Sequence, residues 1–317
     1  MNQPESDITK PLVSVILPAF NAARFLERAL DSVRNQTYPA NRIEVLLVDD
    51  GSTDESLHIA EKYEHQLYDL KVCSQPNQGV SSARNLAILL SNGDLIAFLD
   101  ADDRWLPDKI SQQVAVFDAA PTVGLVHCGC TFVDQNGKKL ENWSRRSRVD
   151  QGDVLLDYIC DFFLITSSVM IPRTVLDDVG YFNESLKVGE DNDLFLRIVA
   201  SYLIGCAPQP LLERTVRSDS LSREDYELDA HTDLQTLQRF LESHPEFARE
   251  NRRRIDAHLS DYLFSYGYRL LEDGRLEQAR DALKRSLRIG WSTRAGRTLI
   301  RSYLPTRIAN RARAKWT

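Results

Sequence analysis

The first hundred or so residues alternate between short apolar runs and amphipathic stretches, and this alternation constrains the fold more than any other feature. Apolar runs occur at 12–17 and 46–48, and a third ends at Leu99. Helical patterns follow at about 22–36, near Asp54 and from Gln78 onwards. Such alternation predicts an α/β fold with a mostly parallel sheet and helices on both faces. Since these sheets bind ligands at the carboxyl ends of their strands, functional residues are expected there.

The run that ends at Leu99 is followed by three carboxylates, Asp100, Asp102 and Asp103. Side chains two apart on an extended segment point the same way, so we expect Asp100 and Asp102 to converge on one divalent cation while Asp103 faces elsewhere. Such a cation prefers carboxylate oxygens and can hold a diphosphate. For an isolated Asp-x-Asp the alternative is a polar strand end before a helix cap. The surrounding motifs favour the metal.

A second pair of acids follows the run at 46–48. Asp49 and Asp50 lead into a turn, and Ser52 or Thr53 is then placed to cap a helix that begins near Asp54. Asp54 itself is interpreted as a turn or capping group. Both acid clusters are thus predicted at strand ends, where an α/β sheet places its ligands.

Five motifs occur in a fixed order: PAFN at 18–21, VDDGSTD at 48–54, NQGVSSARN at 77–85, FLDADD at 98–103 and GEDNDLFLR at 189–197. This order resembles glycosyltransferase family 2, inverting enzymes with the GT-A fold, over about residues 11–222. Processive synthases of that family carry a Gln-x-x-Arg-Trp motif and membrane helices, and neither occurs in this sequence. The resemblance therefore implies a bacterial-type transferase that moves a single sugar.

The resemblance also implies residues that bind the sugar nucleotide. The positions that match Pro18, Ala19 and Phe20, together with Asp50, hold the nucleobase. The position of Arg84 lies close to the nucleotide. By the same resemblance we expect a uridine or deoxythymidine diphosphate sugar as donor. The expected acceptor is a sugar, a lipid-linked oligosaccharide or a protein, in cell-surface polysaccharide or glycoconjugate assembly.

The catalytic and metal positions are implied in the same way. Asp100 and Asp102 occupy the metal and ribose positions, with Asp102 the direct ligand of Mg²⁺ or Mn²⁺. Asp191 matches the general base. Glu190 and Arg217 are candidates for contacts to phosphate or acceptor. Arg217 stands where many relatives carry a histidine, and a guanidinium binds phosphate but cannot ligate the cation.

The expected chemistry accounts for these residue types without the family name. As the glycosidic bond breaks, negative charge accumulates on the nucleoside diphosphate that leaves, and a divalent cation offsets it. A carboxylate such as Asp191, within reach of the acceptor hydroxyl, takes its proton and contributes about 10²- to 10⁴-fold. A single displacement of this kind inverts the anomeric centre.

Simpler alternatives exist for several residues and for the function. Glu190, Asp191 and Asp193 precede an apolar helical stretch, and a helix dipole favours acids in its first turn. Arg84 is also compatible with a place on the surface of its helix. A dinucleotide-dependent oxidoreductase is disfavoured, because the first strand-to-helix turn reads PAFN and not GxGxxG. A non-catalytic sugar-nucleotide-binding or interaction module on the same fold stays open.

Composition indicates an ordinary globular protein. The 317 residues are 43% hydrophobic and 27% charged with a net charge of -7, enough for one large domain and an appendage. Five cysteines without a CxxC pair indicate reduced thiols and not a zinc site. No signal-peptide pattern is expected at the start, and no stretch reaches the ~18 apolar residues of a spanning helix. We therefore expect a cytoplasmic protein.

The pattern from residue 223 onwards is helical. Helical spacing at 256–271, a turn at 272–274 and a helix from Leu276 resemble one tetratricopeptide-type hairpin within a region 223–293. The tail, 294–317, interleaves seven cations and no acid with apolar residues. This pattern is typical of an amphipathic helix at an anionic membrane, here the inner face of the cell membrane. The alternative is a tail docked on the acidic catalytic domain, and that acidity disfavours nucleic acid as a partner.

Overall fold

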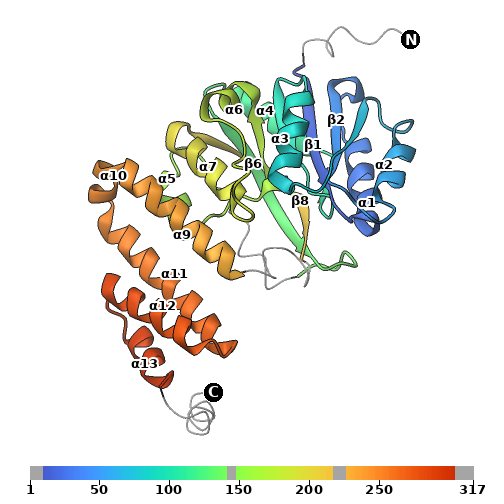
Figure 1. The fold of residues 1–317 in the computed structure, drawn as a ribbon. Coiled ribbons are helices and arrows are strands. Elements are labelled where there is room, and N and C mark those ends of the chain that lie inside the picture. Colours follow the sequence, from blue (N-terminus) through green and yellow to red (C-terminus); the bar gives the residue numbers. More distant parts are fainter. Residues whose placement is uncertain (1–9, 141–147, 217–225, 304–317) are drawn as a thin grey trace. The chain divides into compact units, whose positions relative to one another are not determined.

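The computed structural model describes residues 10–140, 148–216 and 226–303. The chain divides into two compact units, Met1–Asp233 and Leu234–Thr317. The first unit is an α/β structure and the second is helical (Figure 1). The expected α/β fold with a helical C-terminal extension is therefore confirmed. The finer division at 222 and 293 stays a prediction.

An eight-stranded sheet forms the centre of the first unit, in the order β3-β2-β1-β4-β7-β6-β8-β5. The pairs β1–β2, β2–β3, β1–β4 and β6–β8 are parallel. By contrast, β7 runs antiparallel to β4 and β6, and β5 to β8. The sheet is thus mixed, with one parallel part, β3-β2-β1-β4, in the first hundred residues and a second parallel pair, β6–β8, further along the chain. The strands are β1 (Val13–Ala19), β2 (Ile43–Asp49), β3 (Leu70–Ser74), β4 (Leu95–Phe98), β5 (Arg104–Trp105), β6 (Leu125–Val133), β7 (Met170–Pro172) and β8 (Ile204–Thr215).

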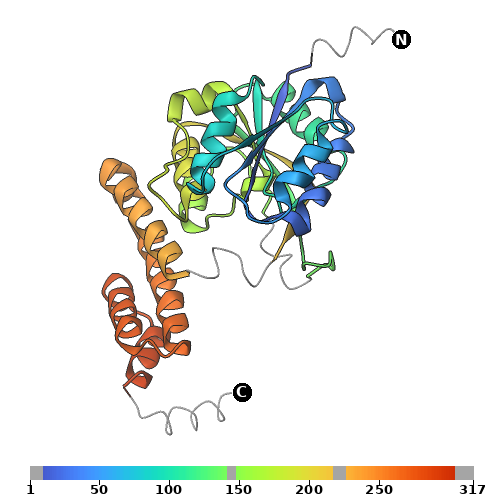
Figure 2. The ribbon, with the colours of Figure 1, turned by 45° about the vertical axis from the view of Figure 1, so that its right-hand side comes forward.

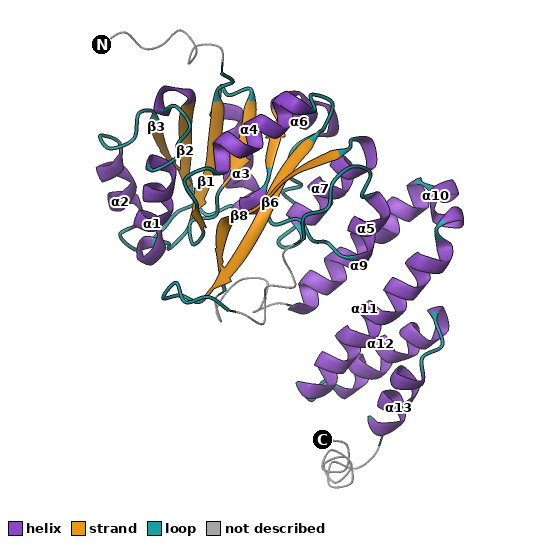
Figure 3. Ribbon diagram, turned by 180° about the vertical axis from the view of Figure 1, so that it is seen from behind, coloured by secondary structure: helices purple, strands orange, loops and turns teal. Residues whose placement is uncertain are grey.

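Helices cover both faces of this sheet, as predicted. On one face α1 and α4 share a core with Val13, Val15 and Leu17 of β1. On the opposite face α3 packs on β1 and β2 (Figures 1 and 3). Since every residue of β1 is buried, its run is apolar apart from Ser14. The helices are α1 (Ala23–Arg34), α2 (Ser56–Tyr63), α3 (Val80–Leu90), α4 (Lys109–Ala119), α5 (Leu155–Cys160), α6 (Arg173–Val179) and α7 (Glu190–Ser201), with 3₁₀ helices η2 (Ala40–Arg42) and η4 (Thr166–Ser168).

Segment 166–172 reads TSSVMIP, a pattern that predicts one strand, and the structure corrects this prediction. Its first three residues form η4, and only Met170–Pro172 joins the sheet as β7. The side chain and the backbone N–H of Ser168 both donate hydrogen bonds to the carbonyl of Ile165. Hydroxyl side chains that bond back to the local backbone compete with strand pairing. The 3₁₀ turn therefore occupies 166–168, and the strand begins only at Met170.

The second unit contains a helical hairpin with a third helix packed on it. The hairpin helices α11 (Arg252–Glu272) and α12 (Leu276–Ile289) lie side by side (Figure 2). A Cβ at Gly267 would lie 3.0 Å from Leu283, so glycine permits this close approach. The other helices are α9 (Tyr226–Ser243), which begins in the first unit, α10 (Pro245–Glu250) and α13 (Thr293–Arg301). The likeness to a tetratricopeptide hairpin stays a prediction.

Part of the predicted basic tail belongs to the core of this unit. In α13, Ala295 is fully buried and packs with Phe264 and Leu283. The guanidinium of Arg294 lies 4.6 Å from the ring centroid of Phe264. The remainder of the tail, 304–317, lies outside the described residues. In the described part of the chain, no helix is both long and apolar enough to span a bilayer.

Candidate active site

The acids that follow β4 lie in a turn, and not on an extended segment as the sequence analysis assumed. The ladder between β1 and β4 ends at Phe98, and one further bond runs from the N–H of Leu99 to the carbonyl of Ile16. The N–H of Asp103 then donates to the carbonyl of Asp100 at 3.0 Å and closes the turn. The alternation argument for Asp100 and Asp102 is therefore wrong, because it needs extended backbone. Their joint action on a metal stays a prediction.

This turn is held from several sides. The carbonyl of Asp102 accepts hydrogen bonds from Arg28 of α1, at 2.8 Å, and from the hydroxyl of Thr215. Asp103 points inward, is 2% exposed and accepts from the N–H of Thr215 at 2.9 Å. Burial, together with the charges of Asp102 and Asp100, raises the pKa of Asp103. The three carboxylates are therefore close enough to repel one another.

Arg84 of α3 joins this turn to the start of α7. Its guanidinium donates to Asp100 at 2.8 Å and to Glu190 at 2.7 Å. Although burial lowers its pKa, the charges of Asp100 and Glu190 raise the pKa of Arg84 above its ordinary value. The guanidinium also lies 5.1 Å from the ring centroid of Phe182. With only 4% exposure, Arg84 does not cover the surface of its helix, so that alternative is wrong.

The acids at the start of α7 have distinct partners. Glu190 is 8% exposed, and burial and the charge of Asp191 raise its pKa against the opposing effect of Arg84. Asp191 accepts hydrogen bonds at both oxygens, from the hydroxyl of Thr166 at 2.8 Å and from the N–H of Asn192 at 2.9 Å. Both acids are first-turn residues of the helix, as one interpretation predicted. A helix dipole alone does not explain the hydrogen bonds of Glu190 with Arg84 and of Asp191 with Thr166.

Asp50 lies at the end of β2 and organises the loop that leads into α3. Its carboxylate accepts hydrogen bonds from Gln75, from the N–H of Gln78 and from the N–H of Gly79, at 2.7, 2.9 and 2.8 Å. It is 4% exposed. The φ of Gly79, +93°, lies in the region that favours glycine. Asp50 therefore shapes the floor of the predicted nucleotide site.

The end of β1 exposes one aromatic ring beside Asp50. Pro18 and Ala19 are buried in the strand, and the carbonyl of Ala19 accepts from the N–H of Asp50 at 2.8 Å. Phe20 comes next and is 50% exposed. Of the three positions that the resemblance assigns to the nucleobase, only Phe20 thus offers a large exposed surface.

Residues 52–54 tie two loops together and do not cap a helix at Asp54. The hydroxyl oxygen of Ser52 accepts from the N–H of Asn21, and the side chain of Asn21 accepts from the N–H of Thr53, both at 2.9 Å. Asp54 accepts from the N–H groups of Ala23 and Ser56. Since the helix begins only at Ser56, the expectation that Ser52 or Thr53 caps it is wrong. The turn role of Asp54 is confirmed.

The acids after β4 fit a divalent cation held jointly with a diphosphate. Among the residues that the structure describes, no three His, Cys, Asp or Glu side chains are arranged to hold a metal. A cation that shares phosphate oxygens and water needs only one or two carboxylates. Asp100 and Asp102 supply them, and a cation would relieve the repulsion that acts on Asp103. Asp102 and Asp100 would therefore hold Mg²⁺ or Mn²⁺ here.

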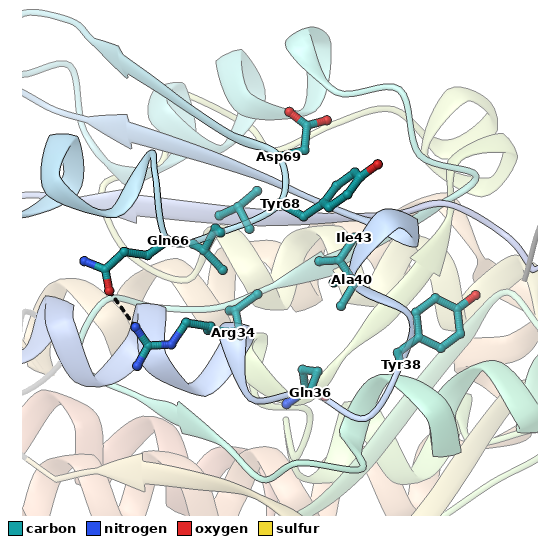
Figure 4. A pocket seen from close by; sticks show the side chains of 11 residues that line it. Arg34, Gln36, Tyr38, Ala40, Ile43, Gln66, Tyr68 and Asp69 are labelled. Carbon is teal, nitrogen blue, oxygen red and sulfur yellow. Dashed lines mark hydrogen bonds between the residues drawn. The ribbon is translucent and has the colours of Figure 1, made fainter. Parts of the chain in front are cut away.

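A cavity of about 60 Å³ lies elsewhere in the first unit (Figure 4). It is lined by Ile43 at the start of β2, Asp69 just before β3 and Arg34 at the end of α1. Arg34 donates to Gln66 across it at 2.6 Å. Ile43 and Asp69 lie at the starts of their strands, whereas Asp50 and Asp100 follow strand ends. The cavity is therefore separate from the candidate active site.

Two site residues were missed by the sequence analysis, and one predicted residue is not described. Thr166 bonds Asp191, and the hydroxyl oxygen of its neighbour Ser167 accepts from the N–H of Asp100 at 3.0 Å. The only sequence signal was the run of three hydroxyl residues at 166–168, interpreted as a strand. Arg217 lies outside the described residues.

Comparison with known sequences identifies the family. The model of glycosyl transferase family 2 matches residues 14–180, which is more than half of the chain. The chain belongs to this family. Over 206 residues it is 32% identical to an uncharacterized glycosyltransferase of Rickettsia prowazekii, a match that covers 62% of this chain and 63% of that protein. The match thus spans less than two thirds of that relative's length.

Solved structures share the fold. S. aureus TarS 1-349, solved in complex with UDP-GlcNAc, has a TM-score of 0.58 at 22% identity, over 92% of this chain and 89% of that chain. The mannosyltransferase PcManGT from Pyrobaculum calidifontis, solved with GDP-Man and Mn²⁺, has a TM-score of 0.60 at 21% identity, over 93% and 80%. At these identities the likeness concerns the fold, and it confirms the expected GT-A type.

Proposed function

We propose that this protein is an inverting, metal-dependent glycosyltransferase that moves one sugar from a nucleoside diphosphate sugar to an acceptor hydroxyl. The observation that carries the proposal is the buried Arg84, which contacts Asp100 on one side and Glu190 on the other. It links the carboxylates assigned to the donor diphosphate with the acid next to the proposed base. Family membership supports the same reaction type.

The donor is proposed to bind over the ends of β1, β2 and β4. The exposed ring of Phe20 offers a face for the nucleobase, and base–aromatic stacking is worth roughly 1–3 kcal/mol. Asp50 holds the loop beneath it. Asp100 contacts the ribose, and Asp102 and Asp100 hold the cation. When bound, Mg²⁺ or Mn²⁺ neutralises the charge that develops on the departing diphosphate.

Asp191 is proposed to remove the acceptor proton. One hydrogen bond from Thr166 and one from the N–H of Asn192 orient its carboxylate. The acceptor oxygen forms a bond to the anomeric carbon while the bond to the diphosphate breaks, and its proton passes to Asp191. The diphosphate leaves from the opposite face, so the configuration inverts. Glu190 and Arg217 are proposed to contact phosphate or acceptor.

The donor is proposed to be a uridine or deoxythymidine diphosphate sugar. The fold neighbours are described with UDP-GlcNAc and with GDP-Man, so nucleotide sugars are the common ligand class. The proposed acceptor is a lipid-linked, sugar or protein hydroxyl in cell-surface polysaccharide or glycoconjugate assembly. A thermal-shift screen of nucleotide sugars with Mn²⁺ identifies the base, because a ligand of the folded state raises its stability.

We further propose that the protein acts in the cytoplasm, on the inner face of the cell membrane. In α13, Arg297 is exposed and Ile300 is 68% exposed, and Trp291 just before this helix is 82% exposed. Cations beside exposed apolar side chains suit an anionic lipid surface. Removal of the whole tail would also remove Ala295 from the core. Arg297→Ala is therefore the sharper test, and it should weaken binding to anionic vesicles about fivefold at low salt.

Replacement of the proposed base tests the function. Asp191→Asn keeps the size of the side chain and removes its basicity, so the transfer rate should fall at least about a hundredfold while donor affinity stays nearly unchanged. Single-turnover rates and donor titrations measure the two quantities. Loss of donor binding at an unaltered rate would reassign Asp191 as a binding residue. Absence of turnover by the unmodified protein with every nucleotide sugar would favour the non-catalytic alternative.

A further inference from the structure

We propose that η4, the turn Thr166–Ser168, is a positioning element that sets the base relative to the donor carboxylates, with Thr166 as the residue that orients Asp191. This inference rests on the proposed function. Each of the three residues of the turn contacts a different part of the site or of its support. The turn thus connects groups that come from three separate elements of the fold.

Thr166 acts on the proposed base directly. Its hydroxyl donates to Asp191 at 2.8 Å, and the residue is 4% exposed. The other oxygen of Asp191 accepts from the N–H of Asn192 in its own helix. The backbone bond alone leaves the carboxylate free to turn about it. The second bond, from Thr166, therefore fixes the plane in which Asp191 meets an acceptor hydroxyl.

Ser167 ties the same turn to the donor side. Its hydroxyl oxygen accepts from the N–H of Asp100 at 3.0 Å, and its side chain also bonds Asp103. Its carbonyl accepts from the indole N–H of Trp105 at 2.8 Å. Ser167 is fully buried, so these bonds form away from water. A shift of the turn would consequently move Asp100 and Asp191 together.

Ser168 rests on a buried polar pair in α4. The amide of Gln113 donates to the carbonyls of Ser168 and Val126, both at 2.8 Å. Its oxygen accepts from the ammonium of Lys109 at 2.6 Å. Lys109 and Gln113 are fully buried, which is rare for lysine. Because Lys109 occupies the amide oxygen, both N–H groups of Gln113 are directed to carbonyls, and the turn has a fixed support.

Replacement of Thr166 by valine removes one hydrogen bond to the base and nothing else that acts on it. Several other groups act on Asp191: Glu190 on its own helix, Arg84 from α3, and Tyr158 from α5. Thr166→Val leaves all of them in place. The variant therefore isolates the effect of the hydrogen bond from Thr166 on the orientation of the Asp191 carboxylate.

Comparison of Thr166→Val with Thr166→Ser tests the inference in the full-length protein. Valine preserves the shape and removes the hydroxyl, so the single-turnover rate should fall about tenfold or more, while the KM for the donor stays within about twofold. Serine keeps a hydroxyl at this position and should restore most of the rate. Ser32→Ala removes a buried hydroxyl that bonds only within α1, at Ala29, and controls for stability.

A double-mutant cycle with Asp191→Asn separates this inference from the proposed function. If Thr166 acts through the base, Thr166→Val should slow the unmodified enzyme but should not slow the Asp191→Asn enzyme further. Full activity of Asp191→Asn would mean that the proposed base is wrong. A slow Asp191→Asn enzyme beside a Thr166→Val enzyme with an unchanged rate would overturn the positioning role alone.

Discussion

Two strand ends in the first unit carry the same sequence pattern, a buried apolar strand followed by acids. The acids nevertheless differ in exposure and in hydrogen-bond partners. After β2, Asp50 is 4% exposed and accepts two bonds from backbone N–H groups. After β4, the side chain of Asp100 is 34% exposed, and its partner is the guanidinium of Arg84. One acid is part of the loop, whereas the other remains accessible to a ligand.

The difference comes from what the following backbone offers. After β2 the chain passes through β3 and returns with two consecutive N–H groups, at Gln78 and Gly79, directed at Asp50. After β4 the chain turns at once, and burial, together with repulsion from the clustered Asp102 and Asp100, raises the pKa of Asp103. An acid whose carboxylate accepts hydrogen bonds from backbone N–H groups, as Asp50 does, supports the loop. Crowded acids with a side-chain partner are suited to binding a cation.

The largest expected effect is the loss of activity in Asp102→Ala. The carbonyl of Asp102 still accepts from Arg28 and Thr215 in the variant, so the turn and the fold should persist. Without the carboxylate, Mn²⁺-dependent nucleotide binding should be abolished and transfer should fall at least about a thousandfold, because the cation supplies several kcal/mol. Nucleotide titration with and without Mn²⁺, and a transfer assay, measure both effects.

The control for this prediction is thermal unfolding, which should be nearly unchanged. Full activity of the unmodified protein in EDTA would contradict the metal assignment. The remaining difference between the two strand ends would then be that Asp100 bonds the side chain of Arg84, whereas Asp50 bonds backbone N–H groups.

Asp50→Ala should have the opposite profile. It removes the acceptor of three hydrogen bonds, from Gln75, Gln78 and Gly79, which contribute about 0.5–1.5 kcal/mol each, so the free energy of unfolding should fall by roughly 1.5–4.5 kcal/mol. Asp50→Asn keeps one acceptor oxygen and should lie between. Urea unfolding measures all three proteins. An unaltered stability with lost donor binding would show that Asp50 is chiefly a ligand contact. Asp50 and Asp100 would then not differ in role.

Local sequence predicted much of the fold. The run at 12–17 overlaps β1, the run at 46–48 lies within β2, and the helix expected at about 22–36 is α1 (Ala23–Arg34). These predictions succeeded because both faces of the parallel strands are buried, which favours mostly apolar residues. Family motifs then placed the acids at strand ends, where the structure has them.

Contacts between distant residues could not be predicted in this way. Arg84 and Glu190 are 106 positions apart, and no local pattern indicates that they pair. The turn at Asp100 depends on where pairing with β1 stops, and η4 depends on hydroxyl bonds to its own backbone. Each of these features is decided by tertiary packing or by side-chain bonds that compete with strand formation.

A third acid, the buried Glu44 at the opposite end of β2 from Asp50, sharpens the comparison with the smallest effect. Burial opposes its ionisation, but hydrogen bonds from Ser14, from Asn92 and from Lys71 prevail and lower its pKa from 4.5 to about 2. A lowered pKa in the folded state contributes stability that is present above the unfolded value and is lost as pH falls from about 4.5 towards 2.

Glu44→Gln should therefore lower the free energy of unfolding by about 1–3 kcal/mol at pH 7 and by less at pH 3. Unfolding free energies of the two proteins at both pH values measure this difference. Equal differences at pH 7 and pH 3 would mean that the charge of Glu44 does not stabilise the fold, and that donors around a buried acid do not by themselves make it structural.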